Sequence, residues 1–219
     1  MSKSVAVIHT GPATLEPLKA RFRQMLPQVR MINIVDDSLL NDAIAAGGLT
    51  QAVTRRMVQY FLIAQDMGVD AIFNACSSVG ETVDAALPLV ETPILKIDEP
   101  MARQAAEIGG RIAVIATVPT TLEPTVRLIE KMAAQMDSEI TIQRALVPDA
   151  FDLLLAGKAE EHDQKVMAEI KGAAEKADAI VLAQCSMARL VPLLGDAVQV
   201  PVLSSPDTGV AYLKEFLGV

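Results

Sequence analysis

The chain has 219 residues and a formal net charge of −8, with 51% hydrophobic residues, 3% aromatic residues and no tryptophan. This length allows one large domain or two lobes of about 100 residues each. The acidic charge and the few aromatic side chains argue against nucleic-acid binding, which needs a basic stripe with stacking aromatics. No apolar run reaches the ~18 residues of a membrane span, and the apolar stretch ending at His9 is too short for a signal peptide. We therefore expect a cytoplasmic protein that does not contact a membrane.

Strands and helices are predicted to alternate along the first half of the chain. Residues 5–8 form a β-branched apolar run that stops at a Gly-Pro turn, which is typical of a buried strand. Residues 51–67 have the apolar spacing of a helix, and Gly68 follows as expected just beyond a helix C-terminus. Residues 70–75 form a short strand that leads into Cys76. This alternation predicts βαβ units and a parallel sheet.

The second half repeats the first in the same order. Residues 6–17 align with residues 113–124, 107 positions later, and nine of the twelve positions are identical. Cys76 aligns with Cys185, 109 positions later, so the two cysteines are one residue out of step within a repeat of about 108. A repeat of this length is a lobe, because solenoid units run to only ~20–50 residues. We predict an N-terminal lobe over 1–100 and a C-terminal lobe over 101–219, with a last helix over 208–216 packing across.

The duplication suggests a chemical role for the two cysteines. A structural disulfide is uncommon in a cytosolic chain, and the His and Cys spacing fits no zinc site, so we predict no metal. Burial as small apolar side chains is the alternative role. In each lobe a predicted strand delivers one cysteine to the carboxyl edge of a parallel sheet, where ligands bind. If a pseudo-two-fold axis relates the lobes, the two thiols face one molecule in the cleft between them, as a racemisation requires.

Hydroxyl residues and predicted helix starts follow each cysteine. Free N–H groups at a helix start lower a thiol pKa, bind a carboxylate and hold the negative charge that develops as an α-proton leaves. Helix capping is the simpler role for the serines that follow directly. The candidate substrate-binding residues at these strand ends and helix starts are Thr10, Asn74, Ser77, Ser78, Thr117, Thr120, Thr121, Ser186 and Met187.

The two histidines differ in their settings. His9 ends the first strand, and its counterpart in the repeat is Ala116, so it is a one-sided candidate for substrate specificity. A structural role at the strand end is the alternative. His162 lies in a charged helical run over 159–163, where we expect it to face solvent. Segments 36–50 and 148–158 are expected to be loops that carry pocket side chains.

The cysteine motifs resemble those of the aspartate/glutamate/hydantoin racemase superfamily. The resemblance rests on Asn74-Ala75-Cys76-Ser77-Ser78, on Ala183-Gln184-Cys185-Ser186-Met187-Ala188, on the turn over 117–121 and on the duplication. It covers essentially the whole chain and implies two pseudo-symmetric α/β lobes, no cofactor, and two cysteines that act as acid and base. The amino-acid racemases usually carry Cys-Asn-Thr at the first cysteine, where this chain has Cys-Ser-Ser. The second motif is closer to the hydantoin racemase branch.

We therefore predict a cofactor-independent racemase or epimerase that moves a proton at the carbon next to a carboxylate or hydantoin carbonyl. The superfamily also includes enzymes that decarboxylate arylmalonates or isomerise maleate, so a cis–trans isomerase or decarboxylase of a small dicarboxylic acid is one alternative. A non-catalytic protein that binds a small molecule is another. The expected partner is a small-molecule carboxylate, and the apolar composition favours a homodimer or homotetramer.

Overall fold

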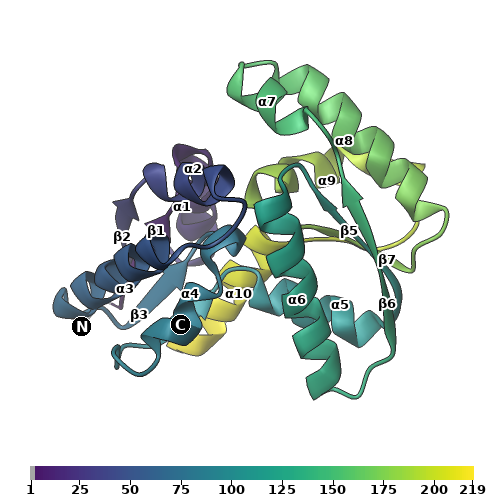
Figure 1. Ribbon diagram of the computed structural model, residues 1–219. Coiled ribbons are helices and arrows are strands. Elements are labelled where there is room, and N and C mark those ends of the chain that lie inside the picture. Colours follow the sequence, from purple (N-terminus) through teal and green to yellow (C-terminus); the bar gives the residue numbers. More distant parts are fainter. Residues whose placement is uncertain (1–2) are drawn as a thin grey trace. The chain divides into compact units, whose positions relative to one another are not determined.

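The computed structural model describes residues 3–219, which form two compact units (Figure 1). One unit contains the described residues up to Glu99 together with Pro206–Val219, and the other contains Pro100–Ser205. Each unit holds one four-stranded sheet in which every strand pair is parallel. The predicted α/β class, with two sheets flanked by helices, is confirmed.

The sheet of the first unit has the strand order β2-β1-β3-β4. Its strands are β1 (Ser4–His9), β2 (Arg30–Val35), β3 (Ala71–Asn74) and β4 (Ile94–Lys96). Its helices are α1 (Leu15–Met25), α2 (Ser38–Ala45), α3 (Gln51–Asp66), α4 (Thr82–Ala86) and α10 (Ser205–Leu217), with short 3-10 helices η1 (Pro12–Thr14) and η2 (Ser77–Val79). The helix predicted over 51–67 is α3, and Gly68 has the positive φ of 68° expected of a helix-ending glycine.

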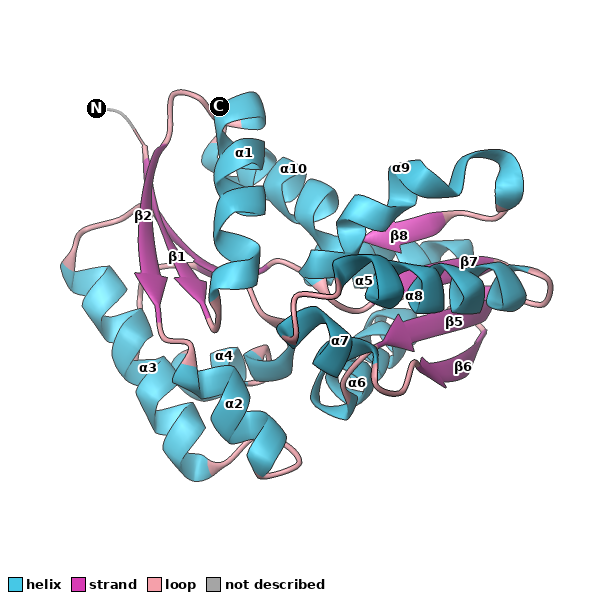
Figure 2. Ribbon diagram, turned by 90° about the horizontal axis from the view of Figure 1, so that it is seen from above, coloured by secondary structure: helices cyan, strands magenta, loops and turns pink. Residues whose placement is uncertain are grey.

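Helices cover both faces of this sheet, with α3 on one side and α1 and α10 on the other (Figure 2). Alternate strand residues such as Ala6, Ile8 and Ile72 pack against α2, α3 and α4. On the other face Phe73 meets Phe22 of α1 edge to face, with ring centroids 6.4 Å apart. Because both faces are covered, the central strands β1 and β3 are apolar except at their ends, whereas the edge strand β2 carries Arg30 and Asn33.

The second unit repeats this topology with the strand order β6-β5-β7-β8. Its strands are β5 (Gly110–Ala116), β6 (Ile140–Leu146), β7 (Ala179–Leu182) and β8 (Val202–Ser204). Its helices are α5 (Glu99–Ile108), α6 (Pro119–Gln135), α7 (Ala150–Leu155), α8 (Ala159–Ala174) and α9 (Val191–Leu194), with 3-10 helices η3 (Cys185–Leu190) and η4 (Gly195–Ala197). One sheet face packs on α5 and α6, and the opposite face packs on α7, α8 and η3.

Two segments expected as loops are partly helical, so that prediction is wrong. Residues 36–50 contain α2, and residues 148–158 contain α7. Both helices are short and gain their stability from packing, through Leu39 and Ala43 in α2 and Ala150 in α7, rather than from a long periodic pattern. Among the described residues, no helix combines the length and the apolar character needed to cross a bilayer.

Candidate active site

Cys76 lies at the carboxyl edge of the first unit's sheet. The β3 strand ends at Asn74, and the N–H of Ala75 still donates to the carbonyl of Ile8 on β1 at 3.0 Å. Cys76 then takes an extended backbone (φ −144°, ψ 119°) and is itself the N-cap of η2. The sheet and the short helix therefore hold a half-buried thiol at the edge where parallel sheets bind ligands.

Several hydrogen-bond donors surround the Cys76 sulfur. The hydroxyls of Thr10 and Ser78 and the backbone N–H groups of Ser78 and Val79 all donate to Sγ. Burial raises the pKa of the Cys76 thiol, and these four donors act in the opposite direction because they favour the thiolate. The net pKa is above its ordinary value, so the resting group is a thiol with donors already placed for a thiolate.

Two charged residues that sequence analysis passed over lie at the same edge. Lys96 ends β4 opposite Asn74 of β3, and Asp98 follows two residues later; they are 9% and 3% exposed. The Ser77 hydroxyl donates to the Asp98 carboxyl group. Burial raises the pKa of Asp98, while the Ser77 hydrogen bond and the Lys96 charge oppose this rise. The signal in the sequence was two charges within the apolar run at residues 93–98.

Asn74 is buried at the sheet edge with its hydrogen-bonding capacity unused. Its side chain is 1% exposed, and neither Oδ1 nor Nδ2 has a hydrogen-bond partner in the described part of the chain. A buried amide that makes no hydrogen bond costs about 1–3 kcal/mol. Such a group needs a polar partner, and this fits the predicted role of Asn74 in holding a polar ligand.

His9 links three elements of the first unit. Its Nε2 lies 3.0 Å from Asn33 Oδ1 on β2, and its Nδ1 lies 2.8 Å from the Thr14 hydroxyl at the start of α1. Because Asn33 Oδ1 only accepts, Nε2 carries the hydrogen, and Nδ1 accepts from Thr14. Burial lowers the pKa of His9, so the ring is neutral at neutral pH. This geometry supports the structural role, and the specificity role remains a prediction.

Cys185 occupies a backbone position one residue further along than Cys76. The N–H of Ala183 donates to the carbonyl of Ile115, just as that of Ala75 donates to Ile8 in the first unit. Gln184, not Cys185, is therefore the topological counterpart of Cys76. The N–H and hydroxyl of Thr117 donate to Gln184 Oε1 at 2.7 and 3.0 Å, whereas the matching Thr10 hydroxyl donates to the Cys76 sulfur. The two thiols thus have different surroundings.

The remaining candidates of the second unit lie at two helix starts. Thr120 and Thr121 are buried in the first turn of α6, and the Thr120 hydroxyl has no hydrogen-bond partner within residues 3–219. Ser186 is half-buried in η3. Met187 is fully buried among apolar residues of α8 and β7, so its side chain supports η3 from inside the core.

The expected helix caps differ from the observed ones. We expected Ser77 and Ser186 to cap the helices that follow the cysteines. Instead Cys76 is the N-cap of η2, and Gln184 is the N-cap of η3. The helices were predicted from Val79 and from Ala188 onward, whereas the 3-10 helices begin two and three residues earlier, so the serines lie inside the first turn.

An ion-pair cluster anchors η3, which carries Cys185. Asp163 of α8 accepts hydrogen bonds from both Nη atoms of Arg189 of η3, one of them at 2.6 Å, and lies 2.8 Å from His162 Nδ1. Because the Asp163 carboxylate only accepts, His162 Nδ1 carries a hydrogen. The Arg189 hydrogen bonds, followed by that of His162, hold the pKa of Asp163 below its ordinary value despite burial. The prediction that His162 faces solvent is wrong, since its side chain is 1% exposed; α8 turns it toward η3.

The polar side chains at the two edges are thiols, hydroxyls and amides, joined at the first edge by the charged residues Lys96 and Asp98. Neither Cys76 nor Cys185 forms a disulfide bond. Within residues 3–219, no group of three or more His, Cys, Asp or Glu side chains is placed to hold a metal ion. The cleft expected between the two halves stays a prediction.

Comparison with known proteins connects these features to characterised relatives. A family model described as Asp/Glu/hydantoin racemase matches residues 5–213. A hydantoin racemase from Rhizobium meliloti is 28% identical over 153 residues, which are 69% of this chain and 61% of that protein's length. The solved structures of a glutamate racemase from Bacillus anthracis (18% identity, TM-score 0.74) and an allantoin racemase from Klebsiella pneumoniae (20% identity, TM-score 0.73) share the fold. The fold matches cover 99% of this chain and 82% and 88% of those structures, respectively.

Proposed function

Because the chain belongs to the Asp/Glu/hydantoin racemase family, we propose that it is a racemase or epimerase in which Cys76 and Cys185 exchange a proton with one substrate carbon. The observation that carries the proposal is the placement of one thiol at the carboxyl edge of each of two duplicated parallel sheets. Catalysis by these side chains requires no cofactor. The cytoplasmic location and the homo-oligomeric state remain predictions.

The proposed chemistry is a balanced proton exchange. The thiolate of one cysteine takes the proton from one face of the carbon, and its sulfur becomes a thiol. The electron pair of the broken C–H bond moves into the adjacent carbonyl, which becomes an enolate. The thiol of the other cysteine then delivers its proton to the opposite face and is left as a thiolate. The configuration inverts, and no group is oxidised or reduced.

The environment of Cys76 assigns it the acid role in the resting enzyme. Burial holds its pKa above the ordinary thiol value, so it carries a proton at neutral pH. When Cys76 acts as the base in the reverse direction, the Thr10 and Ser78 hydroxyls and two N–H groups stabilise its thiolate. In this proposal Cys185 supplies the resting thiolate.

Buried polar groups at the first edge support a carbonyl or carboxylate substrate. Asn74 offers two N–H donors and one acceptor, and Lys96 adds a positive charge at the neighbouring strand end. The Asp98 carboxyl group accepts a hydrogen bond from Ser77 and so orients it, and the same carboxyl group interacts with the Lys96 charge. Such preorganised donors stabilise an enolate oxygen more than a ground-state carbonyl. Because one relative is named a hydantoin racemase, 5-substituted hydantoins are the first substrates to test, followed by aspartate and glutamate.

The test measures inversion and solvent exchange on the same samples. Each single-enantiomer substrate is incubated in deuterated buffer; polarimetry follows loss of optical activity, and mass spectrometry follows deuterium at the reacting carbon. We expect the wild type to invert and exchange together. Cys76→Ser and Cys185→Ser should each lower the inversion rate by about 100-fold or more, the usual contribution of a positioned acid or base. Ser138→Ala, the same loss of a side-chain hydrogen bond in the turn after α6 and away from both cysteines, is the matched control.

Two results would contradict the two-thiol scheme. One is full turnover in either cysteine variant. The other is inversion without any solvent deuterium in the product over many turnovers, because the proton that leaves and the one that arrives occupy different sulfurs.

A further inference from the structure

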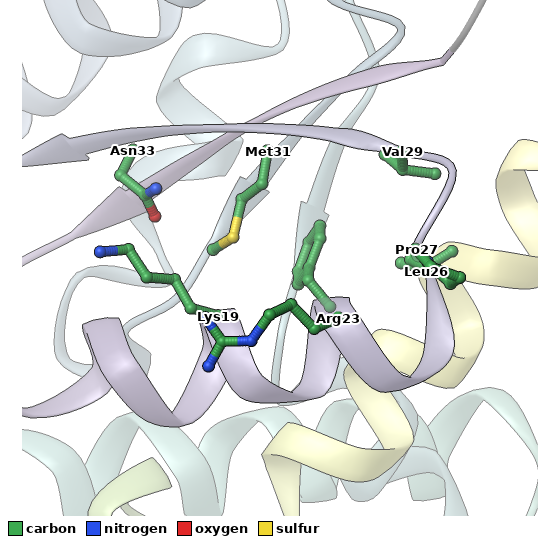
Figure 3. Close-up of a pocket in the computed structure, with 8 residues that line it drawn as sticks. Lys19, Arg23, Leu26, Pro27, Val29, Met31 and Asn33 are labelled. Carbon is green, nitrogen blue, oxygen red and sulfur yellow. The ribbon is translucent and has the colours of Figure 1, made fainter.

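A small pocket opens between α1 and the edge strand β2 of the first unit (Figure 3). Its volume is about 280 Å³, slightly below the ~300–1,000 Å³ of pockets for drug-sized ligands. The apolar part of its wall is formed by Phe22, Leu26, Pro27, Val29 and Met31. The polar part is formed by Lys19, Arg23 and Asn33. The pocket therefore has room for one small molecule with an apolar body.

The polar part of the wall consists of donors. Lys19 and Arg23 are four residues apart on α1, and the Lys19 side chain extends toward Asn33 on β2 (Figure 3). Asn33 Oδ1 already accepts from His9 Nε2, so its amide N–H groups are what it can offer the pocket. Arg23 makes no hydrogen bond or ion pair with any described residue. Lys19 pairs with Glu16 at 2.8 Å, but the Glu16 side chain is 70% exposed, and such pairs contribute only about 0–1 kcal/mol.

On the corresponding face of the second unit, positive and negative side chains neutralise one another. Val7 pairs with Asn33, and its counterpart Val114 pairs with Arg144, so Arg144 on β6 occupies the place of Asn33. The residue of α6 that corresponds to Arg23 of α1 is Glu130.

Arg144 is surrounded by carboxylates from that helix. Its Nε lies 3.3 Å from Glu123, the counterpart of Glu16, and its Nη2 lies 3.5 Å from Glu130. In the second unit the strand cation is thus held by two helix acids. In the first unit two helix cations face a neutral amide and share one exposed acid, so the matching site is short of a negative charge.

We propose that the α1/β2 pocket binds a small organic anion, with its carboxylate or phosphate on Lys19, Arg23 and the Asn33 amide and its apolar body against Phe22 and Met31. The anion takes the place that the Glu130 carboxylate fills in the second unit. Neither cysteine lines this pocket, and the proposal does not depend on the racemase activity.

The test uses benzoate as the probe, benzamide as its uncharged match, and uniformly 15N-labelled protein. We expect benzoate to shift the amide signals of residues 19–33 in a saturable way and benzamide to bind there at least about tenfold more weakly. Arg23→Glu installs the residue type of the second unit and should weaken benzoate binding by about tenfold or more. Lys171→Glu, the same charge reversal on the exposed face of α8, should leave binding unchanged. Circular dichroism confirms that both variants fold.

Three outcomes would overturn the proposal. Shifts at 19–33 that are equal for benzoate and benzamide would mean that charge plays no part. Equal benzoate affinity in wild type and Arg23→Glu would show that Arg23 does not take part in binding the anion. Signals at 19–33 that follow protein concentration, with an oligomeric state changed by Arg23→Glu, would show that a second copy of the chain covers this face. Failure of the racemase proposal would instead show in the activity assay and in the signals of residues 74–79.

Discussion

Asp163→Ala should destabilise the protein well beyond the loss of an ordinary surface charge. Asp163 joins α8 to η3 by accepting from Arg189 and from His162. Its side chain is 16% exposed, and that of His162 is 1% exposed. The substitution therefore removes a charged acceptor from a buried donor as well as from a half-exposed one.

The expected loss in the free energy of unfolding depends on whether Arg189 and His162 can hydrogen-bond to water once Asp163 is removed. Arg189 is 43% exposed and regains water, so its loss is small, about 0.5–1 kcal/mol. His162 cannot reach solvent: its Nδ1–H loses its acceptor, and Nε2 already has no hydrogen-bond partner among the described residues. Leaving this buried donor unsatisfied costs about 1–3 kcal/mol. Together these give a decrease of about 1.5–4 kcal/mol in the free energy of unfolding. Glu130→Ala, which breaks a half-exposed pair in the same unit, should cost under about 1 kcal/mol.

The assay is urea unfolding of wild type, Asp163→Ala, Asp163→Asn and Glu130→Ala as a function of pH. A carboxylate whose pKa is lowered by folding stabilises the protein above the ordinary Asp pKa, and this contribution is lost as pH falls through the lowered value. The stability gap between wild type and Asp163→Asn should therefore be constant near neutral pH and close in acid. The alkylation rate of Cys185 in native protein should change in Asp163→Ala, because η3 loses its anchor, while that of Cys76 stays the same.

The reasoning would be refuted if Asp163→Ala and Glu130→Ala lowered the free energy of unfolding equally. It would also fail if the gap between wild type and Asp163→Asn widened as the pH fell. If Asp163→Ala lowered the free energy of unfolding as expected but left the alkylation rate of Cys185 unchanged, the ion-pair cluster around Asp163 would contribute to stability alone.

Two further predictions address the first unit. Thr10→Val removes a donor that favours the Cys76 thiolate, so the already raised pKa of Cys76 should rise further. Iodoacetamide should therefore label Cys76 of the variant more slowly than Cys76 of the wild type below that pKa, and at the same rate well above it. Labelling of Cys185 is the internal reference. Gly209→Ala should destabilise by about 1–3 kcal/mol, because the new Cβ would lie 2.5 Å from the carbonyl oxygen of Ile97. Gly172→Ala in α8 meets no atom within 4 Å and should stabilise by about 0.5–1 kcal/mol, so thermal melts of the pair that shift in the same direction would contradict the packing argument.

Sequence patterns predicted the repetitive local features of the protein. Strand β1, helix α3 and the parallel α/β class follow from apolar periodicity and turn residues, which act over a few neighbouring positions. The internal repeat predicted a cysteine and a short helix after the corresponding strand of each unit, although it aligned Cys76 with Cys185 where the strand register aligns Cys76 with Gln184. The helices α2 and α7 were missed because their few apolar residues become informative only once they pack on a sheet.

Tertiary structure decided which side chains meet. The apolar run around Lys96 and Asp98 says nothing of Ser77, since that contact depends on β3 and β4 being neighbours. The charged run around His162 resembles a solvated helix face, and only the packing of α8 on η3 buries the ring. The single-residue offset between the cysteines was visible in the sequence. Its consequence, that Gln184 takes the place of Cys76, required the hydrogen-bond register of two strands, because pairing between distant segments is a property of the folded chain.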